Sequence, residues 1–368
     1  MKIKKVVALG AALGVALAGV ALAAPANAEP VSNSYVLVGS DTLQDSINAL
    51  TNGTNVSGSV VRTTAAGATL GNYDAFGSSV IQTKPNGAYF GRPAGSGAGV
   101  TALRASITGN PYTPNPNPAN VPARVVTGQI DIARSSSGPG SNANSAGLLS
   151  YVPYARDAVA YAYNGSNSDL AALTTAQLKQ IYESSTPVVI GSTTVKPRIP
   201  QSGSGTRNFF LSAIGVTTLG STVTDANGTT PENDASVLAA DEIIPFSAAS
   251  WIAQSNGATG LNTITNANVK LGAPNGNAAY TGTGNALVPS DAFYASSFGR
   301  DTYLVVEYKR VNSSDPAYDP KLAALLNPAN ATSLTNTGTF ASTAGAVKRK
   351  FGFLAPSSAT PIRAYTTL

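Results

Sequence analysis

The sequence predicts an α/β fold. Short stretches rich in β-branched and aromatic residues alternate with longer stretches whose apolar residues recur every three or four positions, the pattern of strands connected by helices. The chain has 368 residues, and 43% of them are apolar. It is therefore long enough for two globular domains and too apolar for a disordered protein.

The elements follow from local patterns, taken in chain order. Strands are predicted where apolar side chains alternate or run together, at Tyr35–Val38, Gln129–Ala133, Asp157–Tyr163 and Thr302–Tyr308. Helices are predicted where apolar residues line one face, at Thr42–Leu50, after Gly95–Gly99, at Thr175–Glu183, before Gly215 and at Ser247–Gln254. The Pro/Asn-rich stretch Pro111–Pro122 is predicted to be a surface loop, and no internal repeat is visible.

The first 28 residues resemble a cleavable signal peptide. Lys2, Lys4 and Lys5 form the charged start, Val6–Ala24 is apolar, and Ala26–Ala28 supplies a cleavage site of small residues. A membrane anchor is the alternative, because the apolar stretch approaches spanning length. The cleavage site favours removal, and no Cys follows that would carry a lipid. We therefore expect a secreted protein that is soluble outside the cytoplasm.

The composition excludes several kinds of chemistry. The chain has no His and no Cys, which excludes disulfides, thiolate nucleophiles, Cys/His zinc sites and Ser-His-Asp triads. Its formal charge is +5, and removing the three leader lysines leaves 5 − 3 = +2, so nucleic acid is not expected as a partner. No convincing serine–lysine pair or D-x-D cluster is found, so an enzyme is the least favoured class, and no cofactor is expected.

A turn rich in glycine and serine opens one predicted helix. Within Pro197–Gly215, the residues Ser204, Gly205 and Thr206 precede the helical stripe, and Arg207 follows them. Such a turn offers unpaired backbone N–H groups, hydroxyl donors and the positive end of a helix dipole, which together suit a small oxyanion. The alternative is an ordinary serine-capped helix, and this stretch alone favours neither.

The same arrangement recurs in the chain. Gly39–Thr42 and Gly95–Gly99 also lead into helices, and the strand at Gln129–Ala133 ends in Arg134–Ser137. Ligands bind beyond the carboxyl ends of strands in open α/β sheets. Each motif alone is common as a cap or a loop, but their repetition favours a binding site built of neutral donors.

These motifs resemble those of the phosphate-binding proteins of high-affinity phosphate ABC transporters. The resemblance runs in order from about Val36 to Gly215 and more loosely to the C-terminus. Gly39–Leu43 is similar to the family's first motif, Gly95–Val100 to the second, and Ser204–Arg207 to the S-G-T motif. Carried over position by position, the resemblance implies phosphate ligands at Thr42, Leu43, Ser96, Ser204, Gly205, Thr206 and Arg207.

The resemblance also implies an architecture and partners. The family has a two-lobed class II periplasmic-binding-protein fold, with the ligand in a cleft between the lobes. On this basis we expect residues 1–28 to be the signal peptide, 29–156 plus 300–368 to form domain I, and 157–299 to form domain II. A monomeric solute-binding protein without catalytic activity is expected, with phosphate or a similar small oxyanion as ligand and a transporter permease as partner.

Two positions depart from the family pattern. Ser136 stands where the family has an Asp that accepts the proton of hydrogen phosphate and repels sulfate. The family also has an Arg shortly before S-G-T, and the nearest here, Arg198, is displaced in register. Arg134 and Arg207 are candidates to supply the charge, and Asp41 is a candidate acceptor. For each of these residues a structural role is the alternative: a surface ion pair for the arginines and a helix cap for Asp41.

Two other functions stay open at this point. The loss of the acidic residue at Ser136 suits a binding protein for a different, possibly neutral, solute on the same scaffold. The Asn/Thr/Gly-rich stretches Ser255–Gly284 and Leu325–Thr343 suit an extracellular structural or adhesion protein, although no tandem repeat or wall-anchoring tail supports it.

Overall fold

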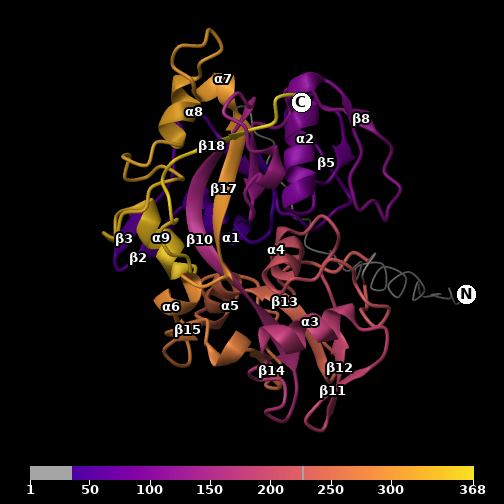
Figure 1. Ribbon diagram of the computed structural model, residues 1–368. Helices are drawn as coiled ribbons and strands as arrows, with labels where there is room; N and C mark the ends of the chain where they lie inside the picture. Colours follow the sequence, from indigo (N-terminus) through magenta and orange to yellow (C-terminus); the bar gives the residue numbers. More distant parts are fainter. Residues whose placement is uncertain (1–34, 226–227) are drawn as a thin grey trace, which may run out of the picture.

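A ten-stranded mixed sheet runs through the whole molecule, which we describe from a computed structural model of residues 35–225 and 228–368 (Figure 1). The predicted signal peptide lies outside the described residues. The main path of the sheet has the order β11 (Val188–Ile190), β12 (Thr193–Pro197), β13 (Glu242–Ser247), β10 (Leu149–Asn164), β17 (Gly299–Glu307), β9 (Ile132–Ser135), β1 (Tyr35–Gly39) and β4 (Leu70–Asn72). Two further strands, β14 (Val269–Leu271) and β18 (Ile362–Ala364), pair with β10.

Strand β10 connects two lobes. It pairs with β17 from Leu149 to Ala158, and from Val159 onward it pairs with β13 instead. The fold is therefore two-lobed, as predicted. We keep as a proposal the predicted division, in which lobe I is 35–156 plus 300–368 and lobe II is 157–299, because β10 exchanges its partners at that point. The predicted strand was shorter than β10, whose pairing with β17 shifts register between Pro153 and Ala155.

Helices cover both faces of the sheet in each lobe. Lobe I carries α1 (Gln44–Asn52), α2 (Ser96–Thr108), α7 (Tyr308–Val311), α8 (Pro320–Leu325) and α9 (Ala344–Lys350). Lobe II carries α3 (Thr175–Glu183), α4 (Gly205–Ala213), α5 (Ala248–Ser255) and α6 (Asp291–Tyr294). Every predicted helix is present within a few residues of its predicted bounds. The capping box of α3, formed by Thr174 and Gln177, explains why that helix was predicted to the residue.

Short elements complete the fold. Four two-stranded ribbons lie outside the main sheet: β2 (Thr54–Val56) with β3 (Ser59–Val61), β5 (Val80–Ile81) with β6 (Phe90–Gly91), β7 (Pro111–Tyr112) with β8 (Arg124–Val125), and β15 (Tyr280–Thr281) with β16 (Val288–Pro289). Single 3-10 turns occupy Gly140–Asn142 and Pro274–Gly276. The predicted loop Pro111–Pro122 is irregular apart from β7 at its start.

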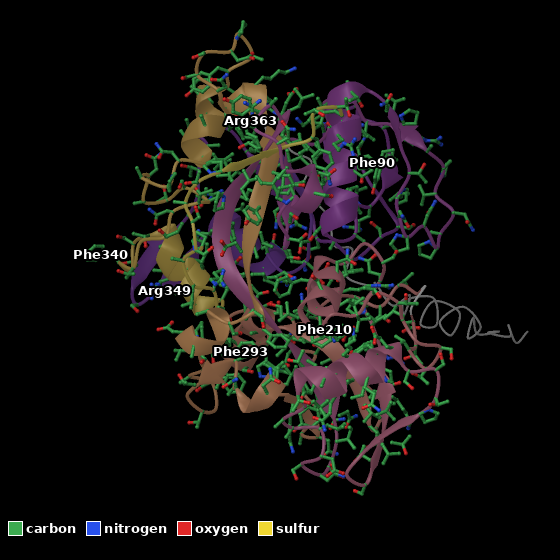
Figure 2. All side chains as sticks on the ribbon, in the orientation of Figure 1. Phe90, Phe210, Phe293, Phe340, Arg349 and Arg363 are labelled. Carbon is green, nitrogen blue, oxygen red and sulfur yellow. The ribbon has the colours of Figure 1, made fainter. Side chains whose placement is uncertain are left out.

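The alternation of side chains along the strands places a hydrophobic core on each face. In β1, Tyr35 and Leu37 join the core under α1, α8 and α9, whereas Val36 and Val38 join the core under α2. In lobe II, Phe210 packs in the core beneath α3 and α4, and Trp251 of α5 packs on the opposite face. Figure 2 shows Phe90 inside the upper lobe and Phe210 inside the lower one. Within the described residues, no helix is long and apolar enough to cross a membrane.

One lysine is buried in lobe I. Lys348 of α9 is 2% exposed and donates to the backbone carbonyls of Tyr154 (2.6 Å) and Leu334 (3.1 Å). Its ammonium group also lies 4.5 Å from the centre of the Tyr154 ring. Burial lowers the pKa of Lys348 from its ordinary value of 10.5 to about 7.

This lysine should make the protein more stable as pH rises above 7. Between the folded and unfolded pKa values only the unfolded chain binds the proton, so the free energy of unfolding should rise by up to about 1.4 kcal/mol per pH unit. Urea unfolding at pH 7, 8 and 9 measures this slope. Lys348→Met should remove it, whereas Lys350→Met on the exposed face of α9 should keep it. An unchanged slope in Lys348→Met would assign the pH dependence to other groups.

Candidate functional site

Three predicted segments of lobe I meet at the edge that faces lobe II. Strands β1 and β9 are parallel, with Gly39 opposite Arg134, so Thr42 and Ser136 leave the sheet at the same edge. Gly39 also bridges to Ala94, which brings the start of α2 and Ser96 to this edge. Ser96 Oγ accepts a hydrogen bond from the backbone N–H of Ser136 at 3.0 Å, and the two hydroxyl oxygens lie 3.1 Å apart.

Lobe II contributes the start of α4. Ser204 Oγ accepts from the backbone N–H of Arg207 at 3.0 Å, so this serine caps the helix. Thr206 is fully buried, and its hydroxyl oxygen lies 3.4 Å from that of Thr42 in lobe I. A Cβ on Gly205 would collide with Ser136 Oγ and lie 2.5 Å from Ser96 Oγ. A glycine at this position therefore lets the backbone of lobe II approach the two serines.

Glu232 of lobe II lies at the centre of these donors. It is fully buried, and its Oε1 accepts from the backbone N–H of Gly205 at 3.0 Å. Its Oε2 accepts from the hydroxyls of Thr42 (3.2 Å) and Thr206 (3.3 Å) and, more weakly, of Ser40 (3.5 Å). The donors that the sequence assigned to an oxyanion thus hold the oxygen atoms of a carboxylate.

Arg300 supplies the positive charge of the site. Its Nη2 donates to the hydroxyl oxygens of Thr206 (2.9 Å) and Thr42 (3.3 Å). Its Nε and Nη2 also donate to Asp157 Oδ2, at 3.1 and 2.8 Å. Asp157 is itself held by donors at the start of α5, the hydroxyl of Ser247 (2.9 Å) and the backbone N–H of Ala249 (3.0 Å). Arg300 is 4% exposed, and its Nη1 has no hydrogen-bond partner.

Asp41 contacts the other lobe and does not cap a helix. Helix α1 has Leu43 at its N-cap, without a side-chain cap, and the Leu43 side chain is buried in the core. Asp41 Oδ1 accepts from Asn233 Nδ2 of lobe II at 3.2 Å. Burial and the nearby Glu232 carboxylate raise the pKa of Asp41 well above its ordinary value, because both disfavour a second negative charge there.

The predicted arginines lie on neighbouring backbone groups. Arg134 is fully buried and donates to the carbonyl of Ser40 (2.9 Å), that of Gly39 (3.1 Å) and the side chain of Asn72 (2.5 Å). Arg207 is partly buried, and its Nη1 donates to the carbonyl of Pro200 at 3.1 Å. Arg198 forms ion pairs with Asp225 and Glu242 within lobe II. In this structure these three guanidinium groups serve the lobes, and Arg300 serves the site.

Two cavities lie beside the site, where the lobes meet. One of about 280 Å³ is lined by residues of lobe I, among them Arg92 and Pro114, and by Gln201 and Thr229 of lobe II. The other, of about 310 Å³, lies between the start of α2 and the turn Ser202–Gly203. Gln201 Oε1 is buried without a hydrogen-bond partner. In the described part of the chain, no group of three or more carboxylates is arranged to hold a metal ion.

Sequence reasoning missed Glu232, Asp157 and Arg300. Glu232 lies in an irregular segment without periodicity, so nothing local places it in the site. A signal did exist for the other two, because Asp157 interrupts the apolar run of β10 and Arg300 stands at the start of β17. A charge inside a buried strand needs a partner. The two residues are in register on neighbouring strands, where the chain passes between the lobes.

Known proteins resemble this chain in fold. Residues 64–307 match a family model described as a PBP superfamily domain. Among solved structures, the chain resembles an ABC-type phosphate transport receptor from Vibrio cholerae, with 15% identity, a TM-score of 0.49, and 88% of this chain and 100% of that chain covered. It also resembles a human phosphate-binding apolipoprotein, with 12% identity, a TM-score of 0.48, and 89% and 92% covered.

A third solved structure is a putative phosphate ABC transporter substrate-binding protein from Clostridium perfringens with bound phosphate. It shares 14% identity and a TM-score of 0.45 with this chain, over 79% of this chain and 93% of that one. No curated protein matches the sequence.

Proposed function

The chain belongs to the PBP superfamily, and from this premise we propose that it is a solute-binding protein that holds phosphate or a similar small oxyanion between its two lobes. The observation that carries the proposal is the convergence of Thr42 from lobe I with Gly205 and Thr206 from lobe II on one pair of acceptor oxygens. Ser96 and Ser136 lie against Gly205 and extend this set of neutral donors. The oxygen atoms of a phosphate need donors of this kind, arriving from several directions.

The unpaired nitrogen of Arg300 supports an anionic ligand. A buried guanidinium N–H group without an acceptor costs free energy, because the group has lost its water and gained no partner. An anion bound beside Thr206, to which Arg300 already donates, would supply a further acceptor. One arginine, paired with Asp157, and several neutral donors would thus share the charge of the ligand.

Protonation would favour hydrogen phosphate over sulfate. Hydrogen phosphate carries a proton that needs an acceptor, and sulfate carries none. Ser136 is a weak acceptor, whereas Glu232 and Asp41 add carboxyl groups to the same region. A carboxylate there attracts the proton of hydrogen phosphate and repels sulfate. Asp41 remains our candidate acceptor, because it follows Ser40 and precedes Thr42 in the best-matched motif.

Ligand binding would act by closing the lobes. The site takes donors from both lobes, so a bound anion would stabilise the closed arrangement over an open one. We propose that the protein is exported, that a transporter permease recognises its closed form, and that the chain acts by binding without catalysis. A neutral solute in place of the anion is the second candidate, favoured by the negative charge of Glu232 within the site.

Thr206→Val tests the proposed site. Valine has the shape of threonine without its hydroxyl, so one ligand oxygen would lose its donor, and phosphate affinity should fall by about 1.5–3 kcal/mol, roughly ten- to a hundredfold. Isothermal titration calorimetry of the mature chain with phosphate, sulfate and a panel of sugars measures this. Thr194→Val, on the exposed face of β12 in the same lobe, is the control and should bind like the wild type. Phosphate binding that survives unchanged in Thr206→Val would remove this residue from the site.

A further inference from the structure

The position of Glu232 adds a device to the proposed function, on which this inference rests. The carboxylate belongs to lobe II, and it accepts hydrogen bonds from Ser40 and Thr42 of lobe I as well as from Gly205 and Thr206 of its own lobe. It is fully buried between them. A charged group of the protein therefore occupies the donors at which the proposed ligand would bind.

The supply of hydrogen atoms makes the two states exclusive. The backbone N–H of Gly205 has one hydrogen, and it points at Glu232 Oε1. The hydroxyl of Thr206 also has one hydrogen, and its oxygen already accepts from Arg300 Nη2, so that hydrogen is directed to Glu232 Oε2. None of these hydrogens can serve a ligand oxygen at full strength while Glu232 holds them.

The segment that carries Glu232 is anchored in lobe II. The neighbouring residue Asn233 accepts from the backbone N–H of Ser247 (3.2 Å) and, through its backbone carbonyl, from Gln254 Nε2 (3.2 Å). Asn233 also donates across the lobes to Asp41 at 3.2 Å. Glu232 is thus presented to lobe I from a fixed base, and rotation of its own side chain is the simplest way for it to leave the donors.

We infer that Glu232 is an internal latch: its carboxylate takes the place of the anion, holds the two lobes closed in the absence of solute, and must be displaced before a solute anion binds. The carboxylate has the right chemistry for the role, since two oxygens with a shared negative charge resemble one edge of a phosphate. The latch lowers apparent affinity, because the ligand must compete with a group that is always present at the site. It also prevents the site from holding open, unpaired donors when no solute is bound.

Glu232→Gln tests the latch directly. The amide has the same shape, but it carries no charge and offers one acceptor oxygen where the carboxylate offers two. In ligand-free protein the lobes should open, which small-angle X-ray scattering detects as a larger radius of gyration than in the wild type. Phosphate and sulfate should both bind about ten- to a hundredfold more tightly in calorimetry, and inorganic phosphate should restore the compact form. Glu183→Gln on α3, with the same change of charge in the same lobe, should behave as the wild type.

The outcomes separate the latch from the proposed function. A Glu232→Gln protein that stays compact without ligand and binds phosphate with unchanged affinity overturns the latch. Weaker phosphate binding with new tolerance of sulfate also overturns it and makes Glu232 the acceptor of the phosphate proton. If neither protein binds phosphate or sulfate but the variant opens, the latch is supported and the proposed function fails. Glu232→Asp, which keeps the charge on a side chain too short to span both lobes, should also open and serves if the glutamine variant does not fold.

Discussion

Arg300→Met is expected to lower phosphate affinity by about a thousandfold, the largest binding effect of any single substitution in the proposed site. The variant removes the buried positive charge of the site and the contacts to the hydroxyls of Thr42 and Thr206. Truncating one partner of a buried, hydrogen-bonded charge pair costs about 2–5 kcal/mol or more, and about 4 kcal/mol corresponds to a thousandfold. Calorimetry with inorganic phosphate measures the change.

Folding must be separated from binding in this experiment. Arg300→Met leaves Asp157 buried without its cation, which destabilises the protein by itself. The double variant Arg300→Met with Asp157→Leu removes both charges and should regain much of the lost thermal stability while binding no phosphate. Arg198→Met, which breaks a partly exposed ion pair of lobe II, should change phosphate affinity less than tenfold. A double variant that binds phosphate like the wild type would show that Arg300 is no part of the site.

Arg134→Met is expected to cause the largest loss of stability, about 3–5 kcal/mol in the free energy of unfolding. The guanidinium satisfies the carbonyls of Gly39 and Ser40 and the Asn72 side chain, all at the carboxyl end of β1. Methionine fills part of the volume but leaves these buried acceptors without donors. Urea unfolding measures the effect.

The same variant distinguishes a structural from a ligand role for Arg134. Burial lowers the pKa of Arg134 to about 10, so the side chain is still charged near neutral pH and its charge is used inside lobe I. Arg207→Met, at a partly buried position, should cost less than about 1 kcal/mol. The opposite result, a fully stable Arg134→Met that has lost phosphate binding, would place the Arg134 guanidinium on the ligand.

The α/β class and most of the elements could be predicted because their signals are local. The helix at Thr175–Glu183 carries its own capping box, and the alternation of Val159, Tyr161 and Tyr163 marks a strand without reference to the rest of the chain. The glycine-rich turns before α2 and α4 are local too. Their donors come from backbone geometry and from the hydroxyls of neighbouring residues.

The charges of the site could not be predicted from the sequence. Whether an arginine faces a ligand or its own lobe depends on which acceptors surround it, and those acceptors come from distant parts of the chain. Arg134 and Arg207 looked well placed because they follow a strand and a turn, yet their donors lie on Ser40 and Pro200. Arg300 looked ordinary in the sequence, and its partner Asp157 lies on the neighbouring strand.

The sequence by itself determined the two kinds of residue period, the serine and glycine turns that open helices, and the absence of histidine and cysteine chemistry. The tertiary structure alone decided which donors converge and which charge they face. Glu232 shows the reason: its acceptor oxygens serve Thr42, 190 positions away, and Gly205, 27 positions away. Contacts of that range depend on how the two lobes meet across β10, and no local pattern of residues encodes them.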